Sequence, residues 1–456
     1  MSRDFPGQEG KVPRTRNTRL HTLLQEADWS GAQLATALRK LADEHAQRLA
    51  CDRSTVSRWL GGTTPRPPAP ELLLQALSRR LQRPVSAAEA GLSSAPATVL
   101  DLSWEADPLH RLTVLTRAEM DPRSRHTLHT GTYSLTVLDV WRSEQTPGAQ
   151  PRQRPPRTRG RTGHAEAEEM RTMARVFAEA AQLHGPGHVR SALAAYLARD
   201  VTGYLHAPAT ENARHHLLVG AAQLALLLGG MSADGGAEAL AQHYQHTAAQ
   251  LAAEAGDAAT FAIALRTMST HAHDMGHHTS AVLHLAERAA DSARAADGTV
   301  GAYAQAQLAV MQAHHSARAA LDALAVAERL HQQAPSAAPG PFSHYPAAAL
   351  HYQRAQMLAT LGDTAGSTRA LATSLRLRDP TERQAATLTR ARLAESCLAQ
   401  GHLDTALAHW RMFLDAYPVL HSSRVAHRLS AMRRLLHPHR RHHATAQLLA
   451  RSAALD

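Results

Sequence analysis

A repeated pattern of a turn followed by a small residue constrains the fold of the C-terminal part of the chain most strongly. Segments such as DMGHHTSAVLHLAERAA and AQGHLDTALAHWRMFL share this pattern. The turns are anchored at Gly276, His314, Gly362 and Gly401, and the small residues five positions later are Ala281, Ala319, Ser367 and Ala406. Small side chains let the two helices of a hairpin pack closely, so the pattern predicts stacked helical hairpins. The longest interval contains an inserted loop, QQAPSAAPGPFSHYP.

These segments resemble degenerate tetratricopeptide repeats, somewhat longer than the usual length of about 34 residues. The resemblance implies a tetratricopeptide-like α-solenoid over residues 165–456, with a concave face that binds a peptide, a protein or a small-molecule effector. We also expect such an array to set the oligomeric state, and a homodimer is one assembly that it would support.

Composition favours helices over sheets, because only 4% of the residues are aromatic. The cores must therefore consist of Leu, Ala, Val and Met, which suits close-packed helices better than sheets. The two cysteines, Cys51 and Cys397, are too few for a disulfide framework. The N-terminus lacks the apolar segment of a signal peptide, and no apolar run reaches membrane-spanning length. We therefore expect a cytoplasmic, all-α protein with no membrane partner.

Residues 19–92 predict five short helices. Apolar residues at helical spacing define the first two, namely Leu20, Leu23, Leu24 and Ala27, and then Leu34, Leu38, Leu41 and Ala42. Ser30 and Gln33 form a capping box at the start of the second helix, and Pro70 starts the fourth. Ser86 and Glu89 form another capping box before a last short helix that ends at Gly91.

The third helix lies in the segment CDRSTVSRWLGG, residues 51–62, and is expected to have one buried and one open side. Asp52 is a good N-cap, and the two glycines end the helix. Val56, Trp59 and Leu60 form a single apolar stripe. The stripe leaves four polar side chains on the open faces, and these are Arg53, Ser54, Ser57 and Arg58. Arginine grips phosphate or guanine and hydroxyls donate to phosphates or base edges, so double-stranded DNA is the expected partner.

The segment TVSRWLGG, placed after GAQLATAL, resembles the helix-turn-helix of the repressor-like, XRE-type transcription regulators. The resemblance implies that Gln33 holds a phosphate. It also implies that five residues of the third helix face the major groove, namely Arg53, Ser54, Thr55, Ser57 and Arg58. One feature departs from the family pattern, since KLADEHAQRLA lengthens the second helix or its turn by roughly three helical turns.

The whole chain resembles an actinobacterial family of regulators with an XRE-type domain, a linker and tetratricopeptide-like helices. That resemblance implies a transcription regulator, with some members acting in differentiation and secondary metabolism. The alternative hypothesis is a tetratricopeptide interaction scaffold whose N-terminal helical domain binds protein. We expect a disordered basic arm over residues 1–18, a DNA-binding domain over 19–92 and a linker region over 93–164. The linker contains an Arg/Pro-rich stretch, PGAQPRQRPPRTRGR.

The position of the basic charge favours DNA binding over the scaffold hypothesis. The net charge is +10, but lysine occurs only at Lys11 and Lys40, and a GC-rich codon bias accounts for part of the arginine. Residues 1–100 hold 14 Lys and Arg against 9 Asp and Glu, whereas residues 166–456 hold 25 against 23. The excess therefore lies mainly near the predicted DNA-binding domain. The basic arm either lies on DNA phosphates or is a plain tail.

Two further segments contain residues that are candidates for binding a ligand. The turn THAHDMGHH contains residues of the kind that bind zinc or nickel, and these are His271, His273, Asp274, His277 and His278. Neighbouring histidines point to different sides of a helix and no cysteine helps, so we expect no metal and no other cofactor. In HGPGH, Gly185 is expected to be a C-cap and Pro186 a helix stop. No catalytic motif is present, so we do not expect an enzyme.

Overall fold

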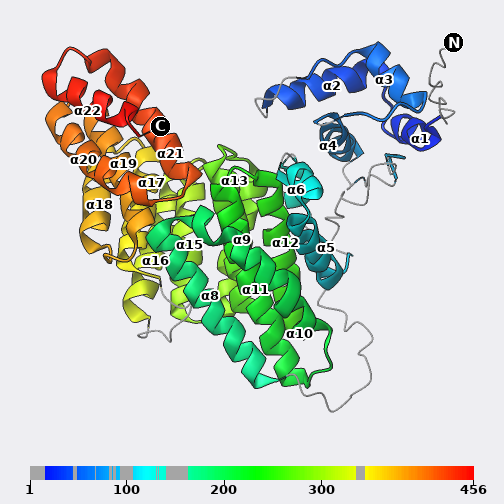
Figure 1. Cartoon of the computed structure of the whole chain (residues 1–456), viewed down its shortest axis with the longest axis horizontal. Coiled ribbons are helices and arrows are strands. Elements are labelled where there is room, and N and C mark those ends of the chain that lie inside the picture. Colours follow the sequence, from blue (N-terminus) through cyan, green and yellow to red (C-terminus); the bar gives the residue numbers. More distant parts are fainter. Residues whose placement is uncertain are drawn as a thin grey trace, which may run out of the picture. The chain divides into compact units, whose positions relative to one another are not determined.

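The computed structural model confirms an all-α fold with helical repeats (Figure 1). It describes residues 16–44, 49–66, 68–81, 85, 89–92, 106–129, 131, 133–139, 163–334, 342 and 345–455. The chain divides into two compact units. The first consists of residues 1–103 and 130–137, and the second of residues 104–129 and 138–456.

Four helices build the core of the first unit, as predicted. They are α1 (Thr18–Glu26), α2 (Gly31–Glu44), α3 (Arg53–Leu60) and α4 (Ala69–Leu81). The predicted apolar residues of α1 and α2 are all buried, and Val56 and Trp59 of α3 pack in the same core. Most of the fifth predicted helix, from Ser86, lies outside the described residues, but its last residues, 89–91, form a turn.

Asn17 joins the two ends of this core, a role that local sequence patterns do not predict. Its Oδ1 caps α1 by accepting a hydrogen bond from the backbone N–H of Leu20 at 3.0 Å. Its Nδ2 donates to the carbonyl oxygens of Ala90 and Gly91 at 2.9 and 3.2 Å. Gly91 has a φ of +64°, and a Cβ there would lie 2.3 Å from the Asn17 side chain. A glycine is therefore required at this contact.

The prediction of a linker over residues 93–164 is wrong for part of that range. Helices α5 (Pro108–Met120) and α6 (Pro122–His129) belong to the second unit, and α5 packs against α12 (Glu238–Ala255). Glu119 of α5 is buried and accepts hydrogen bonds from Arg190 and from the hydroxyl of Tyr244. Because a buried carboxylate requires such partners, α5 is anchored on the repeat helices and is not a connector.

The rest of the predicted linker is only partly described. Residues 136–139 form the short helix α7 (Thr136–Asp139), which identifies the start of TVLDVWR as helical where the sequence left strand and helix open. The Arg/Pro-rich stretch, residues 147–161, lies outside the described residues.

Helical hairpins make up the remainder of the second unit. The segment before the hairpins consists of α8 (His164–His184), α9 (Pro186–Tyr196), a π-helix (Leu197–Val201) and α10 (Thr202–His206). The first three hairpins are α11 (Glu211–Asp234) with α12, α13 (Ala258–Asp274) with α14 (Ser280–Ser292), and α15 (Gly298–Gln312) with α16 (Ala317–Gln333). The last three are α17 (Ala347–Thr360) with α18 (Thr364–Leu377), α19 (Arg383–Ala399) with α20 (Leu403–Ala416), and α21 (Ser423–Leu436) with α22 (His443–Ala453). The four hairpins predicted from the turn pattern, α13–α14 to α19–α20, are confirmed. The array extends further at both ends than the pattern indicated.

The small residues behave as predicted in three of the four hairpins. Ala281, Ser367 and Ala406 are buried, but Ala319 is only half-buried and its neighbour Ala320 is fully buried instead. The turn at His314 also differs from the glycine turns in its backbone conformation. Gly362 has a φ of +85°, whereas His314 is not among the residues with positive φ. The prediction for Ala319 was therefore displaced by one position.

Helix α11 is the described helix that is long and apolar enough to cross a membrane. However, 67% of its apolar window is buried inside the protein. It packs against α8 and α12, and a Cβ on Gly229 would lie only 3.2 Å from the carbonyl oxygen of Ala241. Its apolar residues are thus accounted for by helix packing in the core of the array.

The array also closes on itself. Asp234, at the end of α11, is 5% exposed. It accepts hydrogen bonds from Ser422 Oγ at 2.7 Å, from the Ser423 backbone N–H at 3.0 Å and from Gln384 Nε2 at 3.0 Å. Helix α8 packs against both α11 and α19. Early and late repeats are therefore joined directly.

The HGPGH loop contributes to this closure. Gly185 is the C-cap of α8, as predicted. Pro186, which was predicted to stop that helix, is the first residue of α9. The Gly187 N–H donates to the carbonyl oxygen of His421 at 2.9 Å, and the His421 N–H donates to that of His184 at 2.8 Å. A Cβ on Gly185 would lie 2.6 Å from the His421 backbone, so glycine is needed for this approach.

We predict that Asp234→Ala destabilises the second unit by on the order of 3 kcal/mol, because the Ser422 hydroxyl and the Ser423 N–H lose their acceptor and Gln384 keeps only Ser422. Denaturant unfolding of the intact chain measures the change. Asp404→Ala removes an exposed carboxylate from the same array and serves as the control. Equal stabilities of the two variants would contradict the closure.

We predict that Trp59→Ala lowers the free energy of unfolding of the first unit by about 3–5 kcal/mol, as expected for truncation of a core aromatic. Hydrogen exchange over α1 to α4 in the intact chain measures the effect. Exchange over α11 to α22 provides the internal reference. Unchanged protection of α1 to α4 would show that the Trp59 side chain does not support this core.

Candidate functional site

The exposed side of α3 is the first candidate site. Arg53, Ser54, Ser57 and Arg58 are exposed, whereas Val56 and Trp59 on the opposite side are buried. At about 100° per residue, the four exposed positions share one arc of the helix. The structure therefore brings together the polar side chains that the sequence placed on the open faces.

Asp52 organises the start of α3. Its Oδ1 accepts hydrogen bonds from the Thr55 backbone N–H, from Thr55 Oγ1 and from Ser54 Oγ, each at 2.8 Å. The Thr55 bonds, followed by the one from Ser54, lower the pKa of Asp52 to about 2. Asp52 is thus an ionised cap whose charge is offset by the positive end of the helix.

Thr55 has a different position from its predicted neighbours. It is half-buried, and its Oγ1 donates to Asp52 while accepting from Arg58 Nη2 at 3.1 Å. Its hydroxyl therefore links the cap to the Arg58 side chain. In this arrangement Thr55 positions Arg58, and the open face itself presents the other four side chains.

Gln33 lies at the exposed start of α2 and completes the predicted capping box. Its Oε1 accepts from the Ser30 backbone N–H at 2.8 Å, and Ser30 Oγ caps the Gln33 N–H at 3.3 Å. Among the described residues, no hydrogen bond engages its Nε2. The Gln33 amide group is thus held at a helix N-terminus, where backbone N–H groups favour anions.

The connection between α2 and α3 accounts for the unusual spacing. Helix α2 ends at Glu44, so residues 40–44 of the extra segment are helical, and α3 begins at Arg53. Residues 45–48 lie outside the described residues. Glu44 forms an ion pair with Arg79 of α4 at 2.7 Å, which ties the end of α2 to the core. Cys51, just before α3, is buried, and that burial raises the pKa of its thiol.

The basic arm is only partly described. Arg16 and Arg19 are exposed at the start of α1, whereas Lys11 and Arg14 lie outside the described residues.

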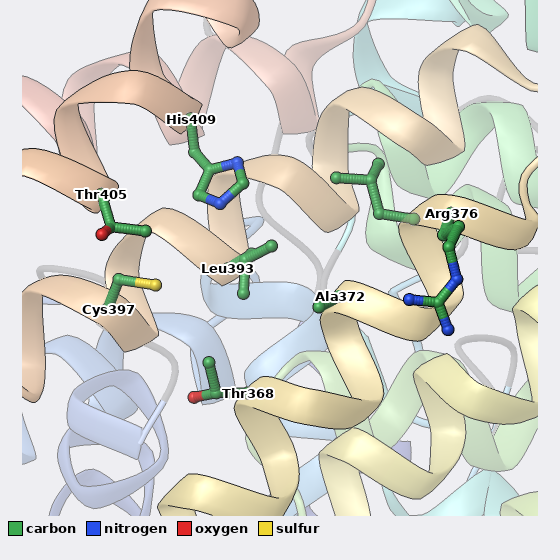
Figure 2. A pocket seen from close by; sticks show the side chains of 8 residues that line it. Thr368, Ala372, Arg376, Leu393, Cys397, Thr405 and His409 are labelled. Carbon is green, nitrogen blue, oxygen red and sulfur yellow. The ribbon is translucent and has the colours of Figure 1, made fainter. Parts of the chain in front are cut away.

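A pocket of about 340 Å³ opens between α18, α19 and α20 (Figure 2). Its lining comprises Thr368, Ala372, Leu375, Arg376, Leu393, Cys397, Thr405 and His409. The surface is mainly apolar, and burial raises the pKa of the Cys397 thiol, which therefore stays protonated. The apolar lining suits an apolar group. No sequence pattern predicted this pocket, because its walls come from three helices.

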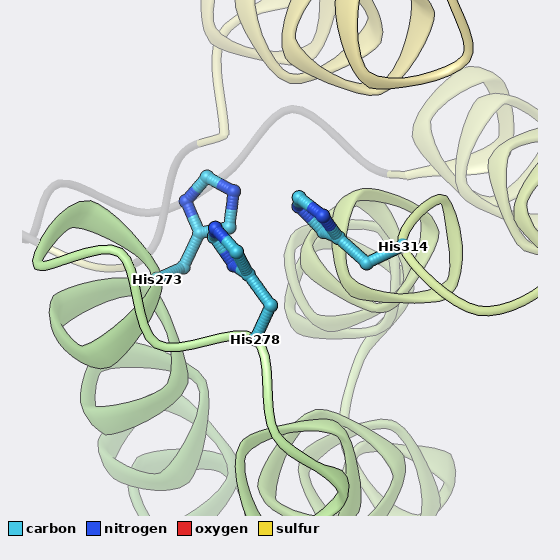
Figure 3. Close-up of side chains that lie close together, drawn as sticks. All are labelled: His273, His278 and His314. Carbon is cyan, nitrogen blue, oxygen red and sulfur yellow. The ribbon is translucent and has the colours of Figure 1, made fainter.

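The histidine-rich turn is divided between two environments. His271 faces Glu238, with Nε2 at 2.5 Å from the carboxylate, and Gln245 at 3.2 Å. His273 and His278 instead gather with His314 of the next hairpin turn (Figure 3). Burial lowers the pKa of His278, and burial together with His278 lowers that of His314 to about 4. The sequence pattern missed His314, which lies in a different repeat.

Comparison with known proteins gives one partial match. The model of a family described as the SP15 N-terminal domain matches residues 20–93, the part of the chain that contains α1 to α4. This description names neither an activity nor a ligand. No curated protein matches the chain.

Proposed function

We propose that this protein is a sequence-specific DNA-binding transcription regulator that acts in the cytoplasm. The observation that carries the proposal is the exposed polar face of α3 over its buried apolar stripe. A short helix that is anchored by Val56 and Trp59 and presents two arginines and two serines has the form of a recognition helix. The resemblance of TVSRWLGG to XRE-type regulators supports the same assignment.

The charges around α3 are consistent with a polyanionic partner. Arg53 and Arg58 project from the exposed arc, and Gln33 stands at the N-terminus of α2. Asp52 carries a negative charge, but its carboxylate is engaged by Thr55 and Ser54. Phosphate contacts by the arginines would supply affinity, and base-edge contacts by the serine hydroxyls would supply specificity.

The helical array is proposed to control how the DNA-binding units are used. Tetratricopeptide-like arrays bind partners or effectors, and the pocket between α18 and α20 is a suitable size for a small apolar group. A single recognition helix contacts few base pairs, so regulators of this type gain affinity by dimerisation on a two-fold site. We assign the array this role of effector binding or dimerisation.

We predict that Arg58→Ala weakens binding of the intact chain to its preferred DNA by about 5- to 150-fold, the equivalent of about 1–3 kcal/mol for a base contact. The preferred sequence comes from selecting genomic fragments with the wild-type protein. Arg318→Ala removes the same charge from an exposed site on α16 and is the control. Equal binding by both variants, or no selected sequence for the wild type, would favour the scaffold hypothesis.

The salt dependence of binding separates phosphate contacts from base contacts. We predict that wild-type affinity falls steeply with salt, because each phosphate contact releases counterions. If Arg53 holds a phosphate, Arg53→Ala reduces the log–log salt slope by about 1 and weakens all sequences equally. Ser57→Ala should leave the slope unchanged and relax selectivity. A flat salt dependence of the wild-type protein would contradict a DNA interface on α3.

A further inference from the structure

Three imidazoles from two neighbouring hairpins meet at one end of the array. His273 lies in the last turn of α13, His278 in the turn before α14, and His314 in the turn between α15 and α16. Each offers a ring nitrogen, and these three nitrogens all lie within 4.8 Å of one another. Figure 3 shows the three rings converging from separate backbone segments. All three residues are half-buried.

Two of these rings carry a buried nitrogen that has no hydrogen-bond partner among the described residues. They are Nδ1 of His278 and Nε2 of His314. Buried polar atoms are nearly always satisfied, so two orphaned acceptors in one cluster require an explanation. The rings stack with their centroids 3.8 Å apart and an interplanar angle of 9°. Ring stacking satisfies neither nitrogen. Because the lone pair of each nitrogen lies in its ring plane, a cation would satisfy both once the two rings turn out of the stack.

The third ring lies beside a carboxylate, at a distance beyond that of a hydrogen bond. His273 Nδ1 lies 3.7 Å from Asp274 Oδ1, and Asp274 Oδ2 accepts from Arg424 Nη2 at 2.9 Å. With Nδ1 directed at a carboxylate, Nε2 is the nitrogen left for a ligand. A carboxylate behind a ligating histidine fixes the tautomer and raises the basicity of the other nitrogen.

We propose that His273, His278 and His314 bind a Zn²⁺ ion that joins the α13–α14 hairpin to the α15–α16 hairpin. Three neutral imidazoles without a thiolate suit Zn²⁺ in tetrahedral coordination, with the fourth position open to water or to an added ligand. Zn–N distances near 2.0 Å place ligand nitrogens about 3.3 Å apart. The three nitrogens must therefore come closer together, and the stacked rings of His278 and His314 must rotate. His278 and His314 lie in turns, where such a rotation does not disturb a helix.

The experiment measures Zn²⁺ binding to the intact chain after chelator treatment, by equilibrium dialysis. Other histidines bind Zn²⁺ weakly, so the comparison is between matched variants. We expect wild type and His315→Gln to share one tight site, and His278→Gln and His314→Gln each to lose it, with at least tenfold weaker binding. His315 is an exposed neighbour of His314 and is not part of the cluster. Equal tight stoichiometry in all four proteins would overturn the proposal.

A measurement on the wild-type protein guards against variants that fail to fold. X-ray absorption at the zinc edge of the protein loaded with one Zn²⁺ should show three imidazole nitrogens near 2.0 Å. Fewer than three imidazoles, or sulfur in the coordination shell, would overturn the proposal. Asp274→Asn should weaken binding about 10- to 100-fold while keeping three imidazoles, because Asp274 positions His273 and does not touch the ion.

Discussion

The arrangement of the helical array depends on one buried carboxylate. Asp234 ends α11 and receives hydrogen bonds from α19 and from the start of α21. Without such contacts, stacked hairpins touch only their neighbours and their curvature is the sum of small rotations. The Asp234 bonds, together with the backbone contact of the 184–188 loop with His421, fix that curvature. The cost of burying the charge, which raises the Asp234 pKa, is offset by its three donors.

Closure determines where a ligand can reach the array. The first helices of repeats usually line the inner surface of a superhelix, and α8 packs against two of them, α11 and α19. That part of the inner surface is therefore covered by the chain itself. The two candidate ligand sites lie elsewhere, in the pocket between α18 and α20 and in the histidine cluster at the hairpin turns. An ion at the cluster would join the end of α13 and the turn before α14 to the turn between α15 and α16.

Local features were predictable because they depend on residues close in sequence. The stripe of Val56 and Trp59, the Asp52 cap and the Ser30–Gln33 box each follow from spacings of three or four residues. The four hairpins follow from turns and small residues at a constant offset. The exposed face of α3 was predicted for the same reason, although the role of Thr55 was not. Its hydroxyl is held between Asp52 and Arg58 and does not simply face outward.

The sequence by itself determined the all-α class, the helices of the first unit and the open face of α3. Only the tertiary structure decided that residues 106–129 belong to the array, because the partners of Glu119 are Arg190 and Tyr244, far along the chain. It also decided that His314 joins His273 and His278, and that Asp234 closes the repeats. Such contacts join side chains from distant turns and helix ends. No periodic sequence pattern predicts these contacts, because the side chains come together only after the helices have packed.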